Sequence, residues 1–256
     1  TEPSGRDTYI PIDKELLSRH IMFLGGIGTG KTNAFNQIIR QLRSSMTKED
    51  IMILFDTKGD FYEAFYRHGD LVISNDNTAT GSDGKNYWNI FNEIERDEHM
   101  EENIVEISKS LFHQKIEKTN QPFFPNAAKD LFAAILTHFT RNPDLTANNE
   151  TLRTFLDGSP TSAIREMLNQ HNDLKAMTSY IFDDRSPQTQ GIISELQQLS
   201  REIFLGNFKK SGSLAMRDIV RKKGGKCVFI EYDLGIGNML SPIYSLLFDL
   251  AIKEAL

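Results

Sequence analysis

Apolar residues gather in short runs towards both ends of the chain, with longer helical repeats between them. The short runs predict strands at His20–Leu24, at Ile51–Phe55, in "DLVIS" (residues 70–74) and at Cys227–Glu231. Apolar positions between Thr32 and Leu42 recur at helical spacing, so a helix is predicted directly after the first strand. Two strands joined by one helix form a βαβ unit, whose crossover we expect to be right-handed.

The middle of the chain has a different pattern. From about Trp88 to Ala215 the periodicity is helical, and no strong strand signal interrupts it. Helix starts are predicted at Asn149, and at Ser159 with Pro160 in the first helical position. A last amphipathic helix is predicted over Ser241–Ala255. The expected order is therefore α/β, then all-α, then α/β again.

The composition is that of an ordinary globular protein, with 39% hydrophobic and 25% charged residues. No apolar run approaches the roughly 20 residues of a membrane-spanning helix, so we expect a soluble chain. The single cysteine, Cys227, suits a reducing compartment, and neither it nor the six histidines show metal-ligand spacing. The net charge of −6 argues against a surface coated in positive charge for nucleic acid, although it allows a local basic channel.

A glycine-rich segment, "GGIGTGKT" at Gly25–Thr32, matches the P-loop pattern of Gly, four residues, Gly, Lys and then Ser or Thr. The glycines let successive N–H groups point into one concavity, at the positive end of the following helix. Lys31 is expected to reach the β- and γ-phosphates of ATP, and Thr32 to bind Mg²⁺ through its hydroxyl. The predicted nucleotide-binding residues are Gly25, Gly26, Gly28, Thr29, Gly30, Lys31, Thr32 and Asn33.

The P-loop makes the α/β part a nucleotide-binding domain. We predict its first part at residues 1–92, an inserted all-α domain at 93–216, and the resumed nucleotide-binding domain at 217–256. Residues 76–86 are rich in Asn, Thr, Gly and Ser and predict a loop.

Catalysis by a P-loop ATPase also needs an acid at the end of a neighbouring strand. Asp56 ends the run Ile51–Phe55, while Glu231 and Asp233 follow the later strand. Each of these acids could instead face solvent or cap the next turn. Asp56, together with Lys31, is the candidate for catalysis.

Basic residues are concentrated between Arg201 and Lys226, where eight of them stand against two acids. Clustered Lys and Arg supply phosphate contacts, so Arg221, Lys222 and Lys223 are candidate DNA-binding residues. A solvated turn before a strand has the same composition, and both interpretations stay open here.

Four segments together resemble the coupling ATPases of bacterial conjugation and type IV secretion, within the hexameric P-loop DNA translocases. "RHIMFLGGIGTGKT" is similar to the Arg-His lead-in of that family to its P-loop, and "FDTKGDFYEAF" to its Asp-Pro-Lys-Gly-Asp segment, with Thr57 in place of proline. "NYWNIFNEI" resembles the link that follows the third strand, and "QPFFPNAAKDLFAAIL" the entry to an inserted all-helical domain.

The resemblance implies a RecA-like P-loop domain with a mainly parallel sheet, and ATP hydrolysis with Mg²⁺ between subunits of a homohexamer. The implied partners are DNA, as a single-stranded transfer intermediate, relaxase or effector proteins, and secretion-channel components. The implied location is a cytoplasmic domain of a bacterial inner-membrane-associated protein. In the family a strand ending in adjacent Asp-Glu follows the stretch where this sequence stops. We therefore expect the resumed nucleotide-binding domain at 217–256 to be truncated and the chain to be a fragment. Such a fragment is expected to bind nucleotide without efficient turnover.

Two other functions fit the same residues. One is a DNA translocase of the chromosome-segregation or DNA-processing class, which shares the P-loop strand but lacks a helical insertion of this length. The other is a nucleotide-binding adaptor that recruits substrate proteins and does not hydrolyse ATP.

Overall fold

The computed structural model describes residues 12–75, 87–232 and 235–256. The chain divides into two compact units, Thr1–Ser45 and Met46–Leu256. The predicted loop at 76–86 and the acid Asp233 lie outside the described residues.

The first unit contains, from residue 12 onwards, a short helix α1 (Lys14–Leu17), an irregular segment, and the helix α2 (Lys31–Ser45). The helix predicted after the P-loop is therefore confirmed. The strand predicted at His20–Leu24 is wrong, because these residues have no regular secondary structure and Met22 and Leu24 are 78% and 85% exposed. A strand exists only where its backbone groups pair with a neighbour, and the described part of this unit contains no second strand.

The second unit contains a three-stranded parallel sheet in the order β1-β3-β2, formed by β1 (Ile51–Asp56), β2 (Leu71–Ile73) and β3 (Lys226–Glu231). All three strands follow the predicted apolar runs. The central strand β3 has the most buried side chains, since both of its edges are paired. Register places Asp56 opposite Glu231, so both acids lie at the carboxyl edge of the sheet.

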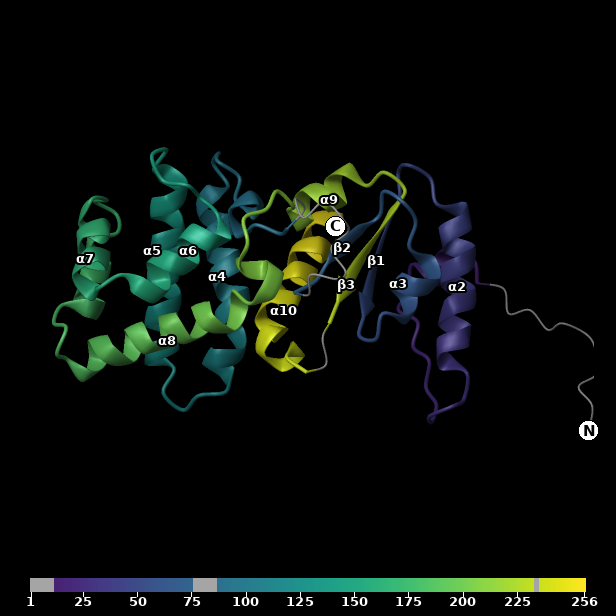
Figure 1. Cartoon of the computed structure of the whole chain (residues 1–256), viewed down its shortest axis with the longest axis horizontal. Helices are drawn as coiled ribbons and strands as arrows, with labels where there is room; N and C mark the ends of the chain where they lie inside the picture. The colour runs from purple at the N-terminus through teal and green to yellow at the C-terminus, as the bar shows by residue number, and fades with distance from the viewer. Residues whose placement is uncertain (1–11, 76–86, 233–234) are drawn as a thin grey trace, which may run out of the picture. The chain divides into compact units, whose positions relative to one another are not determined.

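The other regular elements in the described part of the second unit are helices. They are α3 (Asp60–Phe65), α4 (Met100–Glu117), α5 (Phe123–Arg141), α6 (Asn149–Gly158), α7 (Thr161–Asn169), α8 (Pro187–Ile203), α9 (Met216–Lys222) and α10 (Gly237–Ala255), with 3₁₀ turns η1 (Ile90–Glu93), η2 (Lys175–Ile181) and η3 (Gly206–Lys209). No strand interrupts the described residues from η1 to α9, which confirms the predicted all-α region. Within this unit α10 lies between the sheet and the α4–α8 helices (Figure 1).

The chain enters and leaves the helical region side by side. The Asn89 amide donates to the Leu214 carbonyl at 3.0 Å, and the Leu214 amide donates to the Tyr87 carbonyl at the same distance. The fully buried Asn149 joins this crossing to the helices, because its Nδ2 donates to the Trp88 and Phe208 carbonyls at 2.8 Å each. A residue predicted only as a helix start thus also holds the entrance of the helical region together.

The predicted helix boundaries are accurate to a few residues. α6 begins at Asn149 as predicted, and its cap is the side chain of Asn148, which accepts from the Thr151 amide at 2.9 Å. α10 begins at Gly237 rather than at Ser241, with Pro242 inside the helix.

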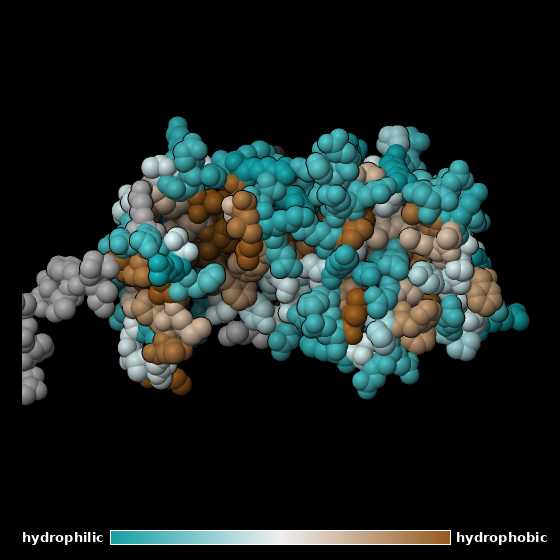
Figure 2. All heavy atoms as spheres, turned by 180° about the vertical axis from the view of Figure 1, so that it is seen from behind, coloured by the Kyte–Doolittle hydropathy of each residue, from teal (hydrophilic) through white to brown (hydrophobic). Residues whose placement is uncertain are grey.

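Among the described helices, none combines the length and the apolar composition needed to cross a bilayer. The face of the molecule seen in Figure 2 is mostly hydrophilic, with hydrophobic residues in separate patches.

A pair of histidines lies where α5 ends. His138 is 7% exposed, and its Nδ1 lies 2.8 Å from Nε2 of His171. Burial lowers the pKa of His138, and the neighbouring His171 lowers it further, because a second positive charge there is unfavourable.

Because of this histidine pair, we expect the folded protein to lose stability in acid. The unfolded chain takes up the proton first, near pH 6.5, so the free energy of unfolding is expected to fall as the pH drops below about that value. Urea midpoints measured at about pH 7.5 and about pH 5.5 check this, and a His138→Gln variant is expected to lose less stability over that interval. The exposed His113→Gln is the control, and an equal loss in all three proteins would contradict the prediction.

Candidate nucleotide site and basic surface

The P-loop segment curls in a way that only glycine permits. Gly28 and Gly30 have positive φ angles of 80° and 85°, a conformation that side chains with a Cβ rarely adopt. A Cβ added at Gly25 would lie 2.5 Å from Oγ1 of Thr29, so a larger residue here would displace the Thr29 side chain that bonds to the Gly26 carbonyl. Gly28 and Gly30 therefore supply the backbone conformation of the loop, and Gly25 leaves room for the Thr29 side chain.

Polar groups hold this curl from inside. The Thr29 hydroxyl donates to the Gly26 carbonyl at 2.9 Å. The Lys31 ammonium donates to the Gly25 and Gly26 carbonyls at 2.6 and 2.5 Å. The lysine ammonium is thus held by carbonyl oxygens of the loop, in a position where an anionic group would attract it.

The start of α2 completes the arrangement. α2 begins at Lys31, so the amides of Lys31, Thr32 and Asn33 belong to its first turn, which has no preceding carbonyls to bond. The positive end of a helix dipole and unpaired amides favour a phosphate group. The donors present, a curled backbone, an ammonium and the Thr32 hydroxyl, fit a triphosphate with its Mg²⁺.

Asp56 has a clear structural role at the end of β1. It is 2% exposed; one oxygen accepts from the Gly59 amide at 2.9 Å, and the other accepts from the Tyr62 amide at 2.8 Å. The carboxylate therefore caps the turn that leads into α3, the alternative that its sequence position left open. A catalytic role for Asp56 stays a prediction.

Glu231 lies beside Asp56 in the register of the sheet, next to aromatic side chains that the sequence did not identify. Burial raises the pKa of Tyr62, and electrostatic interaction with Tyr66 and Glu231 raises it further. The Tyr244 hydroxyl donates to the Glu231 carbonyl at 2.8 Å. The carboxyl edge of the sheet thus has two acids among tyrosines, although only the acids were predicted.

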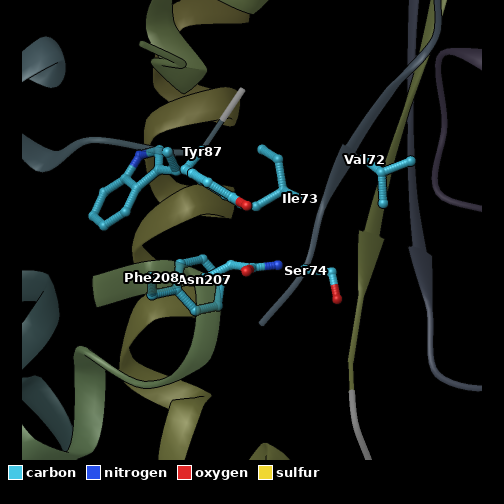
Figure 3. A pocket seen from close by; sticks show the side chains of 7 residues that line it. Val72, Ile73, Ser74, Tyr87, Asn207 and Phe208 are labelled. Carbon is cyan, nitrogen blue, oxygen red and sulfur yellow. The ribbon is translucent and has the colours of Figure 1, made fainter. Parts of the chain in front are cut away.

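A small cavity lies beside the end of β2 (Figure 3). Its volume of about 10 Å³ has room for about one water molecule. Its lining residues are Val72, Ile73, Ser74, Tyr87, Trp88, Asn207 and Phe208. A hollow of this size is too small for a nucleotide or any other organic ligand.

The three candidate DNA-binding residues have different surroundings. Arg221 pairs with both Glu254 and Glu95, and these hydrogen bonds raise its pKa further above that of an ordinary arginine. Lys222 and Lys223 are exposed and line a surface hollow, where the Lys222 ammonium lies 2.7 Å from the Asp218 carboxylate. The structure therefore brings the two lysines together and engages Arg221 with carboxylates of the same chain.

Glu93 is the most buried acid of the second unit among the described residues, and sequence analysis did not identify it. Its oxygens accept from Trp88 Nε1 at 2.7 Å, from the Met216 amide, and from the Arg217 amide at 3.1 Å. Burial raises the pKa of Glu93, while these donors and the Arg217 charge act in the opposite direction. The only sequence signal was an acid in the otherwise apolar segment "NYWNIFNEI".

Solved structures of the bacterial conjugative coupling protein TrwB are similar to this chain. A complex with sulphate gives a TM-score of 0.67 at 17% identity, covering 90% of this chain and 51% of that chain. A complex with ADP and Mg²⁺ gives 0.66 at 16%, covering 89% and 50%. A complex with the non-hydrolysable ATP analogue ADPNP gives 0.67 at 17%, covering 89% and 50%. At this identity the likeness is one of fold, and this chain spans about half the length of these relatives.

No curated protein matches the chain. The family model for the type IV secretion-system coupling protein DNA-binding domain matches residues 7–256, which is almost the whole sequence. Together with the mixed α/β fold and the parallel sheet, this match means that the chain belongs to the family of type IV secretion-system coupling proteins.

Proposed function

We propose that this chain is the ATP-binding part of a coupling motor that delivers DNA, or DNA with bound protein, to a conjugative or type IV secretion channel. The observation that supports this most directly is the curled loop Gly25–Gly30, with the Lys31 ammonium in its concavity and α2 starting behind it. Family membership and TrwB complexes with ADP and with ATP and GTP analogues support the same proposal.

In this proposal the residues of the loop bind and orient the nucleotide. Backbone amides from Gly28 to Asn33 hold the phosphate oxygens, and Lys31 moves from its carbonyl partners to the β- and γ-phosphates. Thr32 contributes a hydroxyl ligand to Mg²⁺, which supplies charge neutralisation when bound. Asp56 is proposed to act in catalysis through its remaining acceptor capacity, while its carboxylate also accepts from the backbone amides of Lys58, Gly59 and Tyr62.

We propose the wider assembly from the membership of this chain in the family. The proposed motor is a homohexamer that acts on single-stranded DNA at the cytoplasmic face of the inner membrane. Its all-α region is proposed to recruit relaxase or effector proteins and to contact channel components. The boundaries 1–92, 93–216 and 217–256 are proposed for the two parts of the nucleotide-binding domain and the insertion.

The test is MgATP turnover with and without single-stranded DNA, measured for the 256-residue chain and for the same residues within a chain of the relatives' length. DNA-stimulated turnover is expected in the longer chain, with binding but little turnover in the shorter one. If both chains bind MgATP and neither hydrolyses it, the result would favour the adaptor that does not hydrolyse ATP. One observation supports that alternative: the Asp56 carboxylate already caps the turn before α3.

A further inference from the structure

A surface hollow lies at the amino edge of the sheet, beside α9. Its volume is about 270 Å³. It lies where β2 and β3 begin, and its lining residues are Leu71, Ser213, Leu214, Ala215, Asp218, Ile219, Lys222, Lys223 and Lys226. All of them belong to the second unit, so the hollow is formed within one compact body.

The charge of this hollow is positive. Lys222, Lys223 and Lys226 are all exposed, and Asp218 is the one acid among the lining residues. The nearby carboxylate of Asp70 accepts from two backbone amides, those of Cys227 and Arg67, at 2.8 Å each. Three ammonium groups against one lining carboxylate contrast with a whole chain of net charge −6.

Lys223 has a backbone conformation that suits glycine. Its φ of 47° and ψ of −104° make it the one non-glycine residue with positive φ in the described parts of the chain. Hydrogen bonds on both sides enforce this conformation: its own amide donates to the Ile219 carbonyl at 3.0 Å, and the Gly224 amide donates to the Lys48 carbonyl at 2.9 Å. A lysine at a strained position, directly before two glycines, points to a role for its side chain rather than for its backbone.

We propose that this hollow binds the backbone phosphates of DNA through Lys222, Lys223 and Lys226. The inference rests on the proposed function, and it refines the candidate set by adding Lys226 and leaving out Arg221. The lining residues include no aromatic side chain on which a base could stack, so the contact is independent of sequence. For the same reason this contact holds single-stranded and double-stranded DNA alike.

The hollow lies away from the carboxyl edge of the sheet, where Asp56 and Glu231 lie. The six residues of β3 separate the two edges by roughly 20 Å. DNA in the hollow therefore leaves the carboxyl edge of the sheet open.

The experiment measures fluorescence anisotropy of a labelled oligothymidylate, and of a labelled duplex, over a series of salt concentrations. Lys223→Gly is expected to weaken binding of both about 3- to 10-fold at low salt and to reduce the slope of log affinity against log salt by about one. Because glycine relieves the backbone strain, the same variant is expected to melt about 2 °C higher. Lys223→Arg, which keeps the charge, and Lys175→Gln, an exposed lysine of η2, are expected to bind nearly as the unaltered chain does.

MgATP binding, measured on the same preparations, separates this inference from the proposed function. If Lys223→Gly and Lys223→Gly/Lys226→Gln keep the DNA affinity and salt slope of the unaltered chain and still bind MgATP, the hollow is not a DNA site. The proposed nucleotide function would be unaffected by that result. If the unaltered chain binds MgATP but no DNA, both the hollow and the DNA part of the proposed function fail. A loss confined to single strands would also contradict the inference, because phosphate contacts make no such distinction.

Discussion

Replacing Lys31 with alanine is expected to weaken MgATP binding by about 100-fold, equivalent to about 2.7 kcal/mol. The Lys31 ammonium donates to the Gly25 and Gly26 carbonyls at 2.6 and 2.5 Å within the curl of the P-loop. A charged hydrogen bond to phosphate is stronger than a bond to a neutral carbonyl, so most of its value is realised when the nucleotide is bound. Isothermal titration of the chain with MgATP measures this directly.

Two further variants make the result specific. Arg40→Ala removes a positive charge from the exposed surface of the same helix, α2, and is expected to leave the affinity within about twofold. Lys31→Arg keeps the charge but places a wider group in the concavity, so it is expected to bind more weakly than the unaltered chain. If Lys31→Ala and the unaltered chain bind MgATP with equal affinity, the P-loop does not bind the nucleotide.

Replacing Glu93 with alanine is expected to lower the free energy of unfolding of the second unit by about 3–5 kcal/mol. The side chain is fully buried and accepts from Trp88 Nε1 and from the Met216 and Arg217 amides. Alanine leaves all these donors buried without an acceptor, and it leaves the guanidinium of Arg217 with one less negative neighbour. Urea unfolding followed by tryptophan fluorescence reports the change, since Trp88 is the single tryptophan.

A glutamine at position 93 is a useful second variant. It can still accept from Trp88 through one oxygen, but its amide nitrogen meets the Arg217 N–H, donor against donor. Glu93→Gln is therefore expected to be destabilised, though less than Glu93→Ala. The matched control is Glu98→Ala at an exposed acid, with an expected change within about 0.5 kcal/mol. A loss below about 1 kcal/mol for Glu93→Ala would mean that this network is not important for stability.

Short sequence patterns predicted most of the helices and strands, and also the conformation of the P-loop glycines. The apolar runs at Ile51–Phe55 and Cys227–Glu231 form strands that pair with each other, and Gly28 and Gly30 of the P-loop have the positive φ angles that glycine favours. The strand expected at His20–Leu24 failed because pairing depends on a distant partner. A run of apolar residues cannot show whether such a partner is present.

The same limit applies to charged residues. Arg221 and Lys222 are neighbours in one basic cluster, yet Arg221 pairs with Glu95 and Glu254, which are far away in the sequence. Asp56 was equally ambiguous, because an acid after a strand can serve either a metal or the next turn. Only the positions of the Gly59 and Tyr62 amides show that the carboxylate caps α3.

The helix α9 has consequences for how mechanical load passes through the second unit. One side of its seven residues borders the basic hollow through Asp218 and Lys222. Its arginines are fixed elsewhere: Arg217 to Glu106 of α4 at 2.6 Å, and Arg221 to Glu254 of α10. α9 therefore connects the basic hollow to two long helices, α4 and α10, through its two arginines. We expect a force on a polymer held at the hollow to pass first to these two helices.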